Sequence, residues 1–566
     1  MYLKLYERCG QILRDLDAKR LREDKRMEIE GLRFHPGDLE SQNRADFDAS
    51  SWPLFEKDQI WGTAKREIVW FDLPFEVPAE LQNEDLLLVF ETDMGHGWEA
   101  TNPQFTVYID GKIRQALDTN HRMVYLHRDD YQGKHRLSLR AYSGEDDGRC
   151  LRMRVYFQAY DRALTDFFYN FSGPYQTLAL MNPDSEDYFQ TLNALNDAVN
   201  CLDLRRFYSP EFYQGLQAAN EMLETAYYEK LCDSKKKPLV RAVGHTHIDI
   251  AWLWTLAVTA DKSVRSFSTV LELMRQFDDY IFMSSQAQLY QYVERLAPDL
   301  LEEIKERVRE GRWEVEGATW VEPDCNLSSG EGLVRQFLYG QRFFREHFDK
   351  TCRILWLPDV FGYSAALPQI IKKSGCDYFM TTKIAWNDTN RLPYDSFEWK
   401  GIDGSRVLTH FAPTREYNRL GDFFPSEVGT FTTYNGMLNE TQVKGAWQRY
   451  GNKDLNSEVL SSYGWGDGGG GTTVEMIERG RRLQRGLRGL PRVQFSTALD
   501  FFKKLEADVS GKRDLPVWDG ELYFEYHRAT LTSMAENKRN NRHSEFALQD
   551  AETLSLWAQN FAAYNY

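Results

Sequence analysis

Hydrophobic and polar positions divide the chain into stretches of different texture. Residues 1–33 combine charge with helical spacing of apolar positions, as in Gln-Ile-Leu-Arg-Asp-Leu-Asp-Ala-Lys-Arg-Leu, which predicts an exposed N-terminal helix. From 34 to 160 the pattern changes to short alternating runs that close on turn residues, such as Phe-Thr-Val-Tyr-Ile-Asp-Gly-Lys. Period-two alternation with Asp-Gly turns predicts a β-sandwich, which we expect to be a structural flank.

Beyond this stretch, residues 161–236 return to helical periodicity and predict a helical linker, which ends near a lysine-rich boundary. From 237 to 498, apolar runs alternate with helical stretches such as 300–311, which stops at a glycine. The candidate strands are 239–244, 281–284, 313–316, 353–357, 377–381, 406–411, 459–463 and 493–496. This rhythm predicts a multidomain α/β protein with a central β/α barrel-like catalytic domain. Helical character dominates from 499 to 566 and predicts the start of a C-terminal helical bundle, incomplete at Tyr566.

Composition narrows the partners and the cellular setting. A length of 566 residues allows several domains, one of them a barrel of roughly 250 residues. A net charge of −16 argues against nucleic acid and against anionic membrane surfaces. Seven cysteines, never in C-x-x-C spacing, are typical of a reduced compartment. With neither a signal peptide nor a membrane-spanning run visible, we expect a soluble cytoplasmic protein.

A histidine and an aspartate follow the first strand of the predicted barrel. His247 and Asp249 lie in Gly-His-Thr-His-Ile-Asp-Ile-Ala-Trp-Leu-Trp, and His245 alternates with them, so a strand would point all three to one face. An imidazole and a carboxylate two residues apart can both bind one divalent cation. Barrels keep their chemistry at the carboxyl ends of strands. An isolated pair of this kind is otherwise a polar strand cap, so the interpretation depends on the rest of the chain.

Two more aspartates follow strand-like runs. Asp359, in Leu-Trp-Leu-Pro-Asp-Val-Phe-Gly, is solvated, a cap, or functional, because aspartate is rarely buried without a partner. If it shares the barrel mouth with His247 and Asp249, it completes three protein ligands for a metal.

Asp467 stands in a glycine-rich segment, Gly-Trp-Gly-Asp-Gly-Gly-Gly-Gly. No lysine follows, so the phosphate-loop pattern is not met. The segment is either a flexible loop or one whose glycines allow a ligand to approach the backbone beside the carboxylate. Glu322 and Asp324 end another strand and suit polar pocket lining better than catalysis.

Taken together, these segments resemble glycoside hydrolase family 38, the α-mannosidases, and specifically its cytosolic/vacuolar and bacterial branch. The matching segments run in family order from about 240 to 550. They are G-H-T-H-I-D-I-A-W-L-W, G-R-W-E-V-E-G-A-T-W-V-E-P-D-C-N-L-S-S-G-E, R-Q-F-L-Y-G-Q-R-F-F, W-L-P-D-V-F-G-Y-S-A-A-L-P-Q-I, G-W-G-D-G-G-G-G and K-R-N-N-R. The first 230 residues resemble that branch's extra β-domain more loosely.

The resemblance implies a role for each candidate. His247, Asp249 and Asp359 fall on zinc-ligand positions, Asp359 also falls on the catalytic nucleophile, and Asp467 corresponds to the general acid/base. The positions expected to line or adjoin the sugar pocket are Trp252, Lys383 and His527.

The implied activity is that of a zinc-dependent retaining α-mannosidase acting on terminal α-mannosides of mannose-containing oligosaccharides or glycans. Retaining glycosidases need two carboxyl groups about 5–5.5 Å apart, one ionised and one protonated. A bound cation would favour the ionised nucleophile, and zinc can orient sugar hydroxyls. The residues leave another divalent ion open, and they leave the linkage preference open.

One departure from the family qualifies this expectation. The family's fourth zinc ligand is a histidine in a Phe-His-Asp or His-His-Asp segment, which this sequence does not reach before Tyr566, so it resembles a chain truncated at its C-terminus. Among the 11 histidines, His527 is the candidate to replace it.

Two alternatives arise from the same residues. The first is a catalytically impaired fragment that binds sugar without turnover, or that self-associates as a homo-oligomer through exposed apolar surface. The second is a metal-dependent amidohydrolase built on His245 and His247, which would require histidines on later strands, where only His410 stands.

Overall fold

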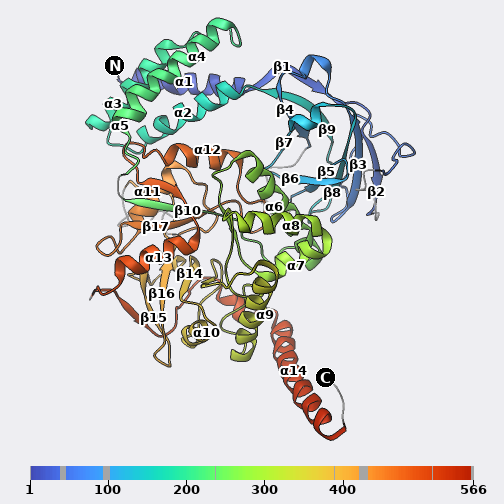
Figure 1. Ribbon diagram of the computed structural model, residues 1–566, viewed down its shortest axis with the longest axis vertical. Coiled ribbons are helices and arrows are strands. Elements are labelled where there is room, and N and C mark those ends of the chain that lie inside the picture. The colour runs from blue at the N-terminus through green and yellow to red at the C-terminus, as the bar shows by residue number, and fades with distance from the viewer. Residues whose placement is uncertain are drawn as a thin grey trace.

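The computed structural model describes residues 2–38, 46–92, 102–235, 238–387, 389–419, 431–512 and 514–562. The described strands form four sheets that alternate with helices, as Figure 1 shows, which confirms the predicted mixed α/β class. The expected boundary between the helical linker and the barrel-like domain, at 236 and 237, lies outside the described residues.

The N-terminal helix and the helices between Arg162 and Leu231 form one helical unit. Its helices are α1 (Tyr2–Arg20), α2 (Arg162–Leu178), α3 (Glu186–Cys201), α4 (Pro210–Leu223) and α5 (Glu229–Leu231). Helices α2, α3 and α4 each begin where a side-chain oxygen, of Asp161, Ser185 or Ser209, accepts a backbone N–H of the first turn.

The prediction of an exposed helix over residues 1–33 is wrong in two respects. Helix α1 buries Cys9, Leu13 and Leu16, which pack in the apolar core of the helical unit. The helix ends at Arg20, and Leu21–Glu28 forms strand β1 instead. The helical spacing of apolar residues reflects a face of α1 that is buried against its neighbours.

The N-terminal β unit consists of two antiparallel sheets. One has the order β1, β9 (Arg154–Tyr160), β4 (Asp85–Glu91), β7 (Met123–Tyr125). The other has the order β2 (Arg33–Pro36), β3 (Ile68–Phe75), β8 (His135–Tyr142), β5 (Gln104–Ile109), β6 (Lys112–Leu117). Inward-facing residues of both sheets, including Phe71, Phe105 and Phe157, share one apolar core. This two-sheet packing is what the period-two pattern predicts, except that it recruits β1 from before residue 34.

Each of the eight predicted segments after residue 238 contains a strand. The first parallel sheet has the order β12 (Trp313–Val315), β11 (Phe282–Ser284), β10 (Leu239–His245), β17 (Glu458–Tyr463), and β18 (Arg492–Phe495) also pairs with β10. The second sheet is mixed, because β15 and β16 run antiparallel. Its order is β13 (Ile354–Trp356), β14 (Tyr378–Thr381), β16 (Arg406–Phe411), β15 (Ser396–Lys400), β19 (Val517–Asp519).

The two sheets approach each other but keep separate ladders. A single parallel bridge joins Gly317, after β12, to Leu355 in β13. Side chains from both sheets, among them Val243, Met283 and Trp356, share one apolar cluster. A closed barrel therefore remains a prediction, whereas one parallel sheet and one mixed sheet over a common core are what the described strands form.

Helices cover these sheets. They are α6 (Leu256–Gln276), α7 (Ala287–Leu296), α8 (Pro298–Arg309), α9 (Gly330–Phe348), α10 (Leu367–Lys373), α11 (Glu440–Arg449), α12 (Val474–Leu483) and α13 (Ala498–Val509). Helix α6 also docks on the N-terminal β unit: the Ala116 N–H donates to Thr269 Oγ1 (3.0 Å), and His127 Nε2 lies 2.7 Å from Glu272 Oε1. Because α6 contacts both units, it fixes their relative placement.

The start of a C-terminal helical bundle, expected over 499 to 566, stays a prediction, and the first described residues of this range pack with the sheets instead. Helix α13 packs Phe501 and Phe502 into the core shared by the two sheets, and β19 then extends the second sheet. Only α14 (Ala535–Ala562) leaves the body of the molecule, projecting as a single helix in Figure 1. Its exposed apolar side chains are Phe546, Leu548, Leu554, Leu556, Trp557 and Phe561. Across the described ranges, we find no helix with the length and apolar content needed to cross a membrane.

Candidate active site

Four residues predicted from the sequence converge at one edge of the sheets. His247 and Asp249 follow β10, Asp359 follows β13, and Asp467 follows β17. One potential ligand atom from each lies within 4.8 Å of the others. The parallel pairing of β10 with β17 brings their carboxyl ends to the same edge, which is why residues 220 apart in sequence meet.

His247 is the centre of this group. Its Nε2 lies 3.5 Å from Asp249 Oδ1 and 3.5 Å from Asp359 Oδ2, while its Nδ1 lies 3.3 Å from Glu322 Oε1. The ring is buried, and neither nitrogen has a hydrogen-bond partner within the described part of the chain. Burial would lower the pKa of His247, but the charges of Glu322 and Asp249 outweigh it and hold that pKa well above its usual value.

These residues fit a divalent cation. A buried Nε2 without a hydrogen bond, facing two carboxylates, offers the nitrogen and oxygen donors that zinc binds. Glu322, beside the opposite ring nitrogen, is placed to fix the tautomer and orientation of His247, as carboxylates do behind metal-binding histidines.

Asp359 is held in its ionised form. Its Oδ1 lies 2.5 Å from Lys383 Nζ, and Lys383 is itself buried, with Nζ 4.1 Å from the centre of the Trp386 ring. Burial would raise the pKa of Asp359, but the contact with His247 and the charge of Lys383 prevail and lower it to about 2.

Asp467 has the opposite electrostatic setting. Burial raises its pKa; the charge of His247 opposes this rise and the carboxylate of Asp359 adds to it. Tyr434 donates a hydrogen bond to Asp467 Oδ1 (2.8 Å). The two carboxyl groups thus have pKa values pushed apart, the pattern of a paired acid and base.

The glycines around Asp467 serve packing against the protein. A Cβ on Gly464 would lie 2.0 Å from the His245 carbonyl oxygen, and one on Gly466 would lie 2.0 Å from Asn435 Oδ1. Trp465 and Gly471 exchange backbone hydrogen bonds of 2.8 and 2.9 Å. The segment is therefore an ordered, hydrogen-bonded loop and not a flexible linker. Close approach is what the glycines permit, but the neighbour here is the protein's own backbone and side chains rather than a ligand.

His245 does not join the group, so the prediction of one shared face is wrong. Its Nδ1 lies 3.1 Å from the Met283 carbonyl oxygen, and its Nε2 accepts from Trp356 Nε1 (3.4 Å). Burial lowers its pKa to about 3. Strand β10 ends at His245, and the backbone turns before His247, which breaks the alternation.

The predicted pocket residues are distributed unequally. Lys383 contacts Asp359 directly, as described above. Trp252 is 44% exposed, with its ring beside Trp254 (5.8 Å between centres). His527 is exposed, and its ring is tilted against that of Phe361 (4.9 Å between centres, 58° between planes). It is not part of the four-residue group, in which Asp467 takes the fourth place.

A cavity of about 250 Å³ opens beside the group. Its lining includes His247, Asp249, Glu322, Asp324 and Asp359, so the pocket-lining interpretation of Glu322 and Asp324 is confirmed. Sequence reasoning missed Tyr434, which follows no strand and carries no motif, and it missed that Glu322 faces His247.

Comparison with known proteins gives the family. The model of the glycosyl hydrolases family 38 N-terminal domain matches residues 237–521, half of the sequence, and the chain belongs to this family. Among its relatives, alpha-mannosidase G of Dictyostelium discoideum is 44% identical over 331 residues, covering 58% of this chain and 28% of that protein. Alpha-mannosidase 2C1 of Mus musculus is 41% identical over 378 residues (67% and 34%), and the alpha-mannosidase of Saccharomyces cerevisiae is 31% identical over 518 residues (86% and 45%). The chain thus spans less than half the length of each of these curated relatives.

Proposed function

We propose that this chain is the catalytic region of a metal-dependent retaining α-mannosidase that removes terminal α-mannose from oligosaccharides or glycans. One observation carries the proposal: oxygens of Asp359 and Asp467 lie within 4.8 Å of each other beside His247 and Asp249. This upper limit is compatible with two carboxyl groups at the roughly 5–5.5 Å of retaining glycosidases. The relatives named alpha-mannosidase support mannose as the sugar.

In the proposed first step, Asp359 attacks the anomeric carbon and the glycosidic C–O bond breaks. Lys383 keeps the attacking carboxylate ionised, and Asp467 gives its proton to the departing oxygen. In the second step Asp467, now ionised, takes a proton from water, and the oxygen of that water displaces Asp359 from the sugar. Two inversions leave the product with the configuration of the substrate.

The proposed metal ligands are His247, Asp249 and Asp359, with Asp467 adjacent. A bound zinc ion would supply positive charge that orients sugar hydroxyls and favours ionised carboxylates. The chain's own contribution is to present His247 Nε2 toward that position, with Glu322 at Nδ1 and the Tyr434 ring against the imidazole (5.0 Å). Zinc is proposed over other divalent ions because the donor set combines imidazole with carboxylates.

The test is hydrolysis of an aryl α-mannoside by the purified 566-residue chain. We expect turnover with zinc, loss of turnover with a chelator, and recovery when zinc is restored, with no hydrolysis of the matching aryl β-mannoside. Proton NMR of the first-formed sugar should show α-mannose, because the mechanism retains configuration. A folded, zinc-loaded protein without turnover would refute the activity, and β-mannose as first product would refute the double displacement.

We also propose a reduced, cytoplasmic setting. Six cysteines in the described ranges, including the buried Cys352 and Cys376, are free thiols. Unpaired cysteines in this number are typical of reducing compartments.

A further inference from the structure

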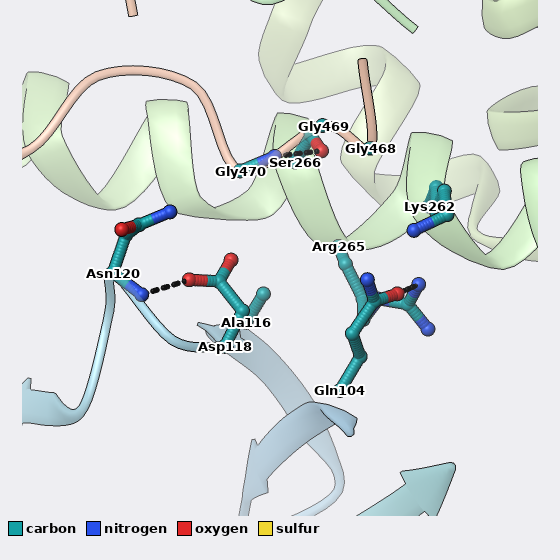
Figure 2. Close-up of a pocket in the computed structure, with 10 residues that line it drawn as sticks. All are labelled: Gln104, Ala116, Asp118, Asn120, Lys262, Arg265, Ser266, Gly468, Gly469 and Gly470. Atoms are coloured by element: carbon teal, nitrogen blue, oxygen red, sulfur yellow. Dashed lines mark hydrogen bonds between the residues drawn. The ribbon is translucent and has the colours of Figure 1, made fainter. Parts of the chain in front are cut away.

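The N-terminal β unit and helix α6 contact the loop that carries Asp467. Figure 2 shows Gly468, Gly469 and Gly470 passing over helix α6, with Asp118 approaching from the β unit below. The Gly470 N–H donates to Ser266 Oγ of α6 (3.0 Å). The space enclosed between them is about 10 Å³, enough for about one water molecule.

This contact leaves the loop little freedom to shift. A Cβ on Gly469 would lie 2.5 Å from Ser266 Oγ, and one on Gly470 would lie 3.1 Å from Asp118 Oδ2. Both glycines have positive φ (+84° and +98°), and Asp467 itself has φ of +60°. A non-glycine residue keeps such a conformation only where its surroundings impose it.

A histidine–aspartate pair supplies the anchor. His121 lies between β6 and β7 and is buried; its Nε2 lies 2.9 Å from the carbonyl oxygen of Thr472. Its Nδ1 lies 3.0 Å from Asp118 Oδ1, which also accepts the N–H of Asn120 (2.8 Å). Both ring nitrogens face oxygen acceptors, so the ring makes both contacts only as the doubly protonated imidazolium, with Asp118 balancing its charge.

Thr472 connects the His121 contact to the loop that carries Asp467. Its side-chain Oγ1 accepts from Tyr280 (2.9 Å), so its backbone and side chain are fixed from two directions. Its neighbour Gly471 pairs with Trp465, two residues before Asp467. The carbonyl held by His121 is therefore one residue from the base of the loop that presents the carboxylate.

We infer that Asp118 and His121 are positioning residues for Asp467, so that the N-terminal β unit sets the placement of the proton donor through the carbonyl of Thr472. This inference rests on the proposed function, in which Asp467 is the general acid/base. The β unit is thereby part of the catalytic apparatus, although none of its described residues lines the cavity beside His247.

The test compares two substitutions of one residue. In His121→Asn the amide nitrogen replaces Nδ1 and keeps the contact with Asp118, whereas in His121→Gln it replaces Nε2 and reaches Thr472. We expect H121N to lower kcat/KM, which reports the step that releases the leaving group, about 10- to 100-fold on methyl α-mannoside, whose leaving group needs a proton. On dinitrophenyl α-mannoside, which leaves without protonation, the loss should be much smaller, and H121Q should recover most of the rate. Equal losses in both variants, or on both substrates, would overturn the inference.

The control is His135→Asn. His135 forms the same kind of trio, with Asp110 (2.7 Å) and the Gln132 carbonyl oxygen (2.9 Å), entirely within the β unit. H135N should leave kcat/KM on both substrates unchanged. A loss matching that of H121N would show that any disturbance of the β unit suffices, which also overturns the inference.

Asp467→Asn separates this inference from the proposed function. If D467N shows the leaving-group dependence and H121N does not, the function stands and the positioning role fails. If D467N shows no such dependence, the acid/base assignment fails, and hydrogen exchange over residues 464–472 decides the anchor. Faster exchange in H121N than in H121Q supports the anchor, and equal exchange refutes it; Asp118→Asn provides the same readout should H121N not fold.

Discussion

Two buried histidines of this molecule share one half of their surroundings and differ in the other. Each has a carboxylate beside Nδ1: Glu322 lies 3.3 Å from His247 Nδ1 without forming a hydrogen bond, and Asp118 forms one of 3.0 Å with His121 Nδ1. At Nε2, His121 meets the Thr472 carbonyl oxygen at 2.9 Å, whereas His247 has no hydrogen-bond partner among the residues described and faces two carboxylates at 3.5 Å. A buried polar atom left without a partner costs about 1–3 kcal/mol, so such an atom is retained where a ligand completes it. The second ring nitrogen thus distinguishes a ligand site from a structural anchor.

The largest effect should come from removing the carboxylate of Asp359, one of the two that face His247 Nε2. Asp359→Asn should lower kcat on an aryl α-mannoside by about 10⁴-fold or more, the scale of losing an enzymatic nucleophile. The matched control is Asp403→Asn, an exposed turn residue that accepts the Ser405 N–H (3.0 Å) and should keep wild-type kcat. Comparable activity of D359N and D403N would remove the nucleophile assignment.

Variants at the two histidines should differ in how zinc changes their thermal stability. With free zinc at 100 times its Kd, binding to the native state adds about 2.7 kcal/mol to the free energy of unfolding. We expect zinc to raise the Tm of the wild type and of H121N, but not of His247→Asn, as measured by scanning calorimetry with and without chelator. A zinc response in H247N equal to that of the wild type would place the metal elsewhere.

Replacing the carboxylates beside Nδ1 of the two histidines should have different, smaller effects on zinc affinity. Glu322→Gln should weaken zinc affinity about 10- to 100-fold, because the residue behind a metal-binding histidine sets its basicity and orientation. Asp118→Asn, the same change behind His121, should leave zinc affinity unaltered. Competition titration with a chromogenic chelator measures both, and an unchanged affinity in E322Q would mean that Glu322 only lines the cavity.

The smallest effect concerns a carboxylate whose partners are neutral. Glu314 accepts the N–H groups of Ala498 (2.7 Å) and Leu499 (2.9 Å), and burial raises its pKa to about 7. A raised carboxyl pKa contributes stability that is complete below the unfolded value of 4.5 and is lost as pH rises through about 7. Glu314→Gln should therefore flatten the fall of the free energy of unfolding with pH in that window, measured by urea unfolding at several pH values. An unchanged slope in E314Q would show that Glu314 is ionised in the fold.

The amidohydrolase alternative loses its geometric basis. It required His245 and His247 to bind one metal, but His245 is turned toward Met283 and Trp356. His410, the later-strand histidine, contacts Ser396 (2.9 Å) inside the core.

Local patterns predicted the strands and allowed His247, Asp249 and Asp359 to meet, because the carboxyl ends of parallel strands lie at one edge. The family resemblance added Asp467 to this group. What local patterns could not predict depends on pairing between distant segments. The split into two sheets turns on which strands exchange hydrogen bonds, and the burial of α1 depends on helices 150 or more residues later. The contact of His121 with Thr472 joins residues 351 apart and leaves no periodic signal in either segment.

The pairing of β10 also has a consequence for how the chain folds. This strand lies beside β17 and β18, and its ion pair between Arg241 and Glu458 (2.7 Å) links residues 217 apart. Until those residues are synthesised, the edges of β10 lack these partners, and Asp467 has no position relative to His247. Contacts of such sequence separation slow folding and prolong exposure of strand edges to aggregation. Production at low temperature, or with chaperones that protect the unfinished sheet, should therefore raise the yield of native protein without any change in its final stability.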